Sequence, residues 1–202
     1  MTIAETPPAA SPRRNFWRFV LLMLLIVPAI PSLFLLIVSF YGKAAGCDPA
    51  GAVCVIGGRS LGDLAKRSLE AAAGFAAFFV FLGGFWFALA LLPIHRAFAG
   101  AGARLLAALF TAGWSVIGAI VMGFVALVNI ASHCSFNEGG VGTCRIFDVG
   151  TTSGHHIGTA IWGVMIGVPL AGLIFLVYAV IVTIVANKTK QKRLTFPPRA
   201  PS

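Results

Sequence analysis

Long runs of apolar residues, separated by short polar segments, dominate the pattern of this chain. A helix needs about 20 mainly apolar residues to cross the hydrocarbon core of a membrane. Helices in soluble proteins average about 12 residues. The pattern predicts an all-α integral membrane protein, an antiparallel bundle of four transmembrane helices connected in sequence order. The predicted spans are residues 16–41, 69–92, 105–131 and 157–186.

Prolines and polar tails mark the limits of these spans. Pro28 and Pro31 lie near the middle of the first span, and each removes a backbone donor, so we expect a kink there. Pro93 follows the second span and predicts its end. Residues 1–15 and 187–202 lack an apolar period, which predicts disordered tails on either side of one transmembrane domain over residues 16–186.

The composition agrees with a membrane location. Of the 202 residues, 58% are hydrophobic and only 10% are charged, whereas roughly 25% are charged in soluble proteins. The apolar surface therefore requires the lipid bilayer as a partner. The net charge of +9 does not indicate nucleic-acid binding, because the basic residues flank the spans and form no stripe.

The basic residues also orient the chain. Ten of them lie on the side of both termini and five on the other side. Since basic residues are retained in the cytoplasm, both termini are expected there. A high Ala and Gly content with few Lys favours a bacterial inner membrane. The ten are Arg13, Arg14, Arg18, Arg96, Arg104, Lys188, Lys190, Lys192, Arg193 and Arg199, and the five are Lys43, Arg59, Lys66, Arg67 and Arg145.

All four cysteines fall in the two outer loops. Disulfides persist outside the cytosol, so this placement supports the same orientation. Four cysteines allow three pairings. Close spacing favours Cys47–Cys54 and Cys134–Cys144, each of which closes a short loop. Each bond is expected to stabilise the protein by roughly 2.5–3 kcal/mol.

Four spans with two outward cysteine pairs resemble the membrane oxidases that make disulfides with quinone. The resemblance covers this layout only, and it implies a quinone-linked thiol-disulfide oxidoreductase. Those enzymes carry a Cys-x-x-Cys pair with one reactive thiol. Here six residues separate Cys47 from Cys54, and none of them is basic.

Three histidines are expected at one depth on the outer side. His133 lies just beyond the outer end of the third span, and His155 and His156 precede the fourth. With Glu138 or Asp148 they could bind a transition metal, because imidazole suits Zn, Cu and Fe. Their spacing matches no known site. No catalytic residue and no cofactor are therefore predicted.

Small residues recur at helical spacing near and within the fourth span. They are Gly154, Gly158, Gly163 and Gly167. Small residues four positions apart let two helix backbones approach closely. The spacing predicts a packing face toward the third span or toward a partner.

The spans carry no ionisable residue in their central parts. Ion-coupled transporters usually place such groups there. The expected function is therefore a non-enzymatic accessory or scaffolding subunit, whose disulfide-bonded outer loops contact another membrane protein or a second copy. The thiol-disulfide oxidoreductase is one alternative, and a small oligomeric channel or carrier is another.

Overall fold

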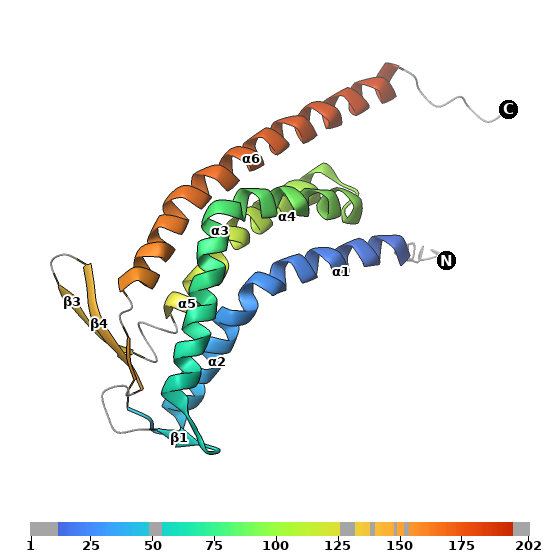
Figure 1. Ribbon diagram of the computed structural model, residues 1–202. Helices are drawn as coiled ribbons and strands as arrows, with labels where there is room; N and C mark the ends of the chain where they lie inside the picture. The colour runs from blue at the N-terminus through green and yellow to red at the C-terminus, as the bar shows by residue number, and fades with distance from the viewer. Residues whose placement is uncertain are drawn as a thin grey trace.

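Long helices, joined by two small antiparallel sheets, make up the computed structural model (Figure 1). It describes residues 12–48, 54–125, 132–137, 140–147, 149–151 and 154–195. The helices are α1 (Pro12–Ile26), the 3-10 turn η1 (Val27–Ala29), α2 (Ile30–Ala44), α3 (Leu61–Ala97), α4 (Ala101–Gly113), the π-helical turn η2 (Trp114–Gly118), α5 (Ala119–Val125) and α6 (Gly154–Thr195).

Three helical stretches of the described chain are long and apolar enough to cross a membrane. They are Pro12–Ala44, Ala101–Gly123 and Trp162–Lys192, which correspond to the first, third and fourth predicted spans. Large apolar side chains cover their outer faces, among them Leu106 at 70% exposure and Leu176 at 61%. Such faces suit contact with lipid, which indicates a multi-pass membrane protein.

The predicted second span lies within α3, which extends beyond residues 69–92 at both ends. The helix begins at Leu61 because Ser60 caps it: the Ser60 Oγ accepts a hydrogen bond from the Asp63 N–H at 3.3 Å. It then continues through Pro93 to Ala97. A proline removes one backbone donor, and the surrounding helix can persist when neighbouring helices pack against it.

The two terminal helices also extend into the predicted tails. Helix α1 starts at Pro12 and α6 runs to Thr195. Proline is favourable in a first helical turn, where its missing N–H has no partner to lose. Lys190 and Lys192 lie near the carboxyl end of α6, where positive charge complements the helix dipole.

The kink expected in the first span is confirmed. The turn η1 separates α1 from α2, and Figure 1 shows the chain changing direction there. Pro28 lies inside η1 and has no N–H to donate to the Leu24 carbonyl four residues earlier. In hydrocarbon such a carbonyl needs another donor, because no water is available.

Two tryptophans supply donors at this break. The Trp86 indole N–H on α3 donates to the Leu24 carbonyl at 3.0 Å, and the Trp114 indole N–H on η2 donates to the Leu25 carbonyl at 2.7 Å. The first of these carbonyls is the one that Pro28 leaves without a helical donor. The break in the first span is thus stabilised by side chains from α3 and η2.

The loops between helices contain strands that the sequence analysis did not predict. The strands are β1 (Val55–Ile56), β2 (Arg59–Ser60), β3 (Ser132–Asn137), β4 (Gly140–Ile146) and β5 (Val149–Thr151). β1 and β2 form an antiparallel hairpin, and β3, β4 and β5 form an antiparallel sheet in that order. The β1–β2 turn consists of Gly57 and Gly58, at φ +59° and +78°. Two consecutive positive φ angles favour glycine in a tight hairpin turn.

Helix α3 is central and packs against α1, α2, α4 and α6. Figure 1 shows the start of α1 and the end of α6 at one end of the molecule and the strands at the other. We call these the terminal end and the loop end. One buried cluster lies between α2 and the start of α3, and consists of Leu35, Val38, Leu61, Ala65, Leu69 and Phe147. A second lies among α1, α3, η2, α4 and α6, and consists of Leu21, Phe87, Ala90, Ile94, Ala108, Ala112, Val116 and Ala171.

Candidate functional site

The loop end is held by a disulfide between Cys47 and Cys54, whose Cα atoms are 5.9 Å apart. Two backbone hydrogen bonds flank it. The Cys47 N–H donates to the Gly42 carbonyl at 3.0 Å, and the Leu61 N–H donates to the Cys54 carbonyl at 2.9 Å. The bond therefore ties the end of α2 to the start of α3. Both cysteines are partly buried against the apolar cluster of the loop end.

Phe147 anchors the second loop to the first. Its side chain is fully buried in the cluster of the loop end, and its backbone has a positive φ of +42°. Gly42 makes room for the ring, because a Cβ at Gly42 would lie 2.7 Å from Phe147 Cζ and would also meet Leu61. Phe147 thus connects the loop between α5 and α6 to the loop between α2 and α3. We call these two loops together the loop cap (residues 45–48, 54–60, 132–137, 140–147 and 149–151).

The second predicted cysteine pair lies across two neighbouring strands. Cys134 on β3 is the direct register partner of Cys144 on β4. Because Cys47 is bonded to Cys54, Cys134–Cys144 is the pairing left for the other two. This second bond stays a prediction, which the backbone register favours.

The three candidate metal-binding histidines occupy two elements of the loop end. His133 lies on β3 opposite Arg145, and His155 and His156 lie in the first turn of α6. Their side chains fall outside the described parts of the chain. Within those parts, no group of three or more His, Cys, Asp or Glu could hold a metal. The metal hypothesis therefore stays a prediction.

The glycines of the predicted packing face all lie on α6. Gly154 and Gly158 are in its first turns, and Gly163 and Gly167 are buried. A Cβ at Gly167 would lie 2.8 Å from Val116 Cγ1 of η2. At this position α6 approaches the third predicted span, which is one of the two neighbours expected for the packing face. The four-glycine face as a whole stays a prediction.

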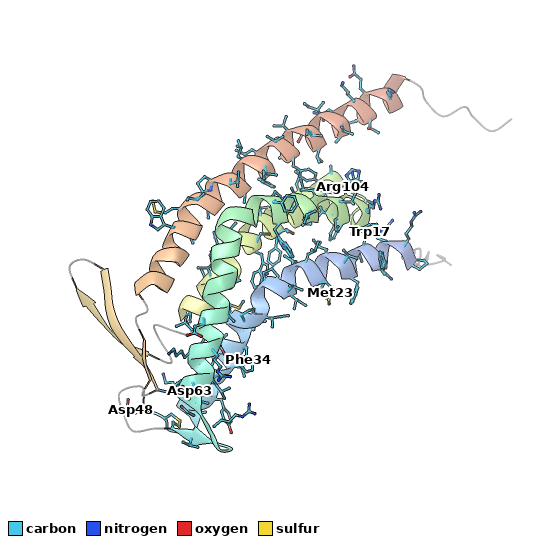
Figure 2. The ribbon with its side chains drawn as sticks, in the orientation of Figure 1. Trp17, Met23, Phe34, Asp48, Asp63 and Arg104 are labelled. Atoms are coloured by element: carbon cyan, nitrogen blue, oxygen red, sulfur yellow. A yellow bond between two sulfur atoms is a disulfide. The ribbon has the colours of Figure 1, made fainter. Side chains whose placement is uncertain are left out.

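The terminal end is basic and rich in aromatic contacts. The Arg96 guanidinium lies 4.5 Å from the centre of the Trp17 ring, and that of Arg18 lies 5.5 Å from the centre of the Phe98 ring. Arg104 donates from Nε to the Phe98 carbonyl at 2.7 Å. These contacts join α1 to the turn between α3 and α4. Figure 2 shows Trp17 and Arg104 at this end, with Asp48 and Asp63 at the other.

Comparisons with known proteins give no relative: no family model, no curated protein and no solved structure matches this chain. The fold itself defines a class: a multi-pass membrane protein with one disulfide-bonded loop end and one basic end.

Several residues that hold the structure together were not predicted from the sequence. The Gly57-Gly58 pair was a usable hairpin signal, because it follows two β-prone residues and precedes Arg59. Phe147 was also visible as a large apolar residue in a polar loop. Nothing in the sequence near Trp86 or Trp114 indicated that their indole N–H groups would donate hydrogen bonds to carbonyls of another helix.

Proposed function

We propose that this chain is a bacterial inner-membrane protein that crosses the membrane four times, with both termini in the cytoplasm, and serves as a non-enzymatic accessory or scaffolding subunit. Its loop cap lies in the periplasm and contacts another membrane protein. The observation that carries this proposal is the loop cap itself, in which a disulfide closes the first loop and the buried Phe147 anchors the second loop to it.

The placement of the first and last helices supports four crossings. The start of α1 and the end of α6 both lie at the terminal end of the molecule (Figure 1). An odd number of crossings would leave them on opposite sides of the membrane. Helix α3 packs against α1, α2, α4 and α6 and runs from the loop end to the terminal end. It is therefore the natural fourth span.

The chemistry of the two ends supports the orientation. A disulfide is stable on the oxidising side of a bacterial membrane, and the Cys47–Cys54 bond lies at the loop end. Arg18, Arg96 and Arg104 lie at the terminal end. Basic residues near span ends are retained in the cytoplasm.

A structural role for the disulfide supports a non-enzymatic function. Cys47 and Cys54 pack against buried apolar residues at the junction of α2 and α3. A thiol in apolar surroundings is a poor nucleophile, because burial disfavours the thiolate. The same packing leaves the loop cap as the fixed surface outside the membrane to which a partner can bind.

Site-specific photo-crosslinking tests the proposal. A photoreactive amino acid would replace Arg59, which is exposed in the hairpin of the loop cap, and in a control it would replace Lys188, which is exposed on α6 near the terminal end. We expect a discrete adduct with one other membrane protein from the Arg59 position and none from the control. An adduct with a second copy would make the partner this chain itself. Absence of any discrete adduct from an accumulating protein would refute the scaffolding role.

A further inference from the structure

A groove runs along the terminal end between α6 and the turn that joins α3 to α4. Its volume is about 500 Å³. One wall is apolar and comes from α6, with Ile181, Val182 and Val185. Ile181 and Val185 are more than half exposed. The groove is thus accessible from the side of the bundle that faces lipid.

Basic side chains from three helices line the same groove. His95 comes from the last turn of α3, Arg104 from α4 and Lys190 from α6. No acidic residue of the described chain lines it. The hydrogen bond from Arg104 Nε to the Phe98 carbonyl fixes the guanidinium, whose two terminal nitrogens can still donate to a ligand. Positive charge without a counter-charge favours an anionic group.

Tyr178 adds a directed donor to this groove. It lines the groove from α6, and its hydroxyl is buried without a hydrogen-bond partner among the described residues. Buried hydroxyls almost always have a partner, so one without a partner calls for an explanation. An acceptor oxygen of a ligand in the groove would provide one.

We propose that this groove binds one anionic phospholipid. The phosphate pairs with Arg104 and Lys190, the Tyr178 hydroxyl donates to a phosphate or ester oxygen, and an acyl chain lies along Ile181, Val182 and Val185. A basic pocket beside an apolar wall, at the level of the cytoplasmic leaflet, is the arrangement that anionic lipids recognise. This inference rests on the proposed orientation, but it is independent of any protein partner of the loop cap.

Lipid titration of the purified full chain in a neutral detergent, followed by native mass spectrometry, tests the site. The probes are phosphatidylglycerol and phosphatidylcholine with identical acyl chains. The test variants are Lys190→Gln and Tyr178→Phe. The latter removes only an oxygen that has no partner, so the fold should be kept. The control is Arg67→Gln, an exposed basic residue of α3 at the loop end.

The expected result is preferential binding of phosphatidylglycerol. Each test variant should weaken it by about ten-fold, the size of a lost hydrogen bond to a charged group. The control should bind like the parent. Equal binding of phosphatidylcholine, or unchanged binding by both test variants, would overturn the proposal. Competition by glycerol phosphate at similar concentrations would show a site for soluble phosphates instead.

Discussion

The two ends of the molecule are held by different kinds of interaction. At the loop end a covalent bond, a hairpin and a buried phenylalanine fix the chain. At the terminal end, arginines lie over aromatic rings, and within the described residues no disulfide joins the helices. Cation–π contacts at exposed sites contribute about 0.5–1 kcal/mol each, well below the roughly 2–4 kcal/mol of a disulfide. The loop end should therefore be the more rigid of the two.

The largest expected difference comes from removing an aromatic ring at each end. Phe147→Ala should destabilise the protein by about 3–5 kcal/mol, because it empties a fully buried position. Phe98→Ala, at the terminal end, should cost markedly less, since its ring is only partly buried. Thermal unfolding of both variants in the same detergent measures the difference. Equal losses would remove the distinction between the ends.

Removing the Cys47–Cys54 disulfide tests the covalent part of the comparison. The double change Cys47→Ser and Cys54→Ser should lower stability by about 2–3 kcal/mol, by freeing a short loop in the unfolded chain. Amide hydrogen exchange should rise at the start of α3 and stay unchanged at its end near Arg96. Increased exchange at both ends would show that the ends are not independent.

The tryptophan donors at the proline break should have an intermediate effect. Trp86→Phe and Trp114→Phe each leave a carbonyl of α1 without its side-chain donor, at a cost of about 1–2 kcal/mol. The matched control is Trp162→Phe, because Trp162 is 60% exposed. Chemical unfolding in detergent compares the three variants. A control as unstable as the other two would mean that ring size matters here and the N–H does not.

A pair of glycine changes in α6 should have the smallest effect, and only one of the two should destabilise the protein. Gly167→Ala places a Cβ 2.8 Å from Val116 Cγ1 and should destabilise the protein by about 1 kcal/mol. Gly172→Ala meets no atom within 4 Å and should be neutral or stabilising, since alanine favours helix. Thermal unfolding of the two variants gives the sign. If both behave alike, Gly167 is not a packing position.

What the sequence could predict depended on the range of the interaction. Apolar runs are local, so the first, third and fourth spans were found, and so was the effect of Pro28. The spacing of Cys47 and Cys54 also pointed to their bond, which the structure contains. The limits of α3 were missed because the Ser60 cap and passage through Pro93 depend on neighbours.

Some contacts join residues far apart in sequence. Phe147 is buried against Gly42, and the Trp86 indole N–H donates to the Leu24 carbonyl. No periodicity in a single chain reveals such pairs. The groove beside Tyr178 is of the same kind, because three helices have to come together to form it. The loop cap and the groove were therefore less predictable from the sequence than the spans.

The sidedness of the two ends is the central claim, and reporter fusions test it most directly. A reporter active only in the periplasm and one fluorescent only in the cytoplasm would be fused before Met1, after Ser60 and after Ser202. We predict cytoplasmic signals at both termini and a periplasmic signal after Ser60. A periplasmic signal at either terminus, or a cytoplasmic signal after Ser60, would contradict four crossings with the loop cap outside.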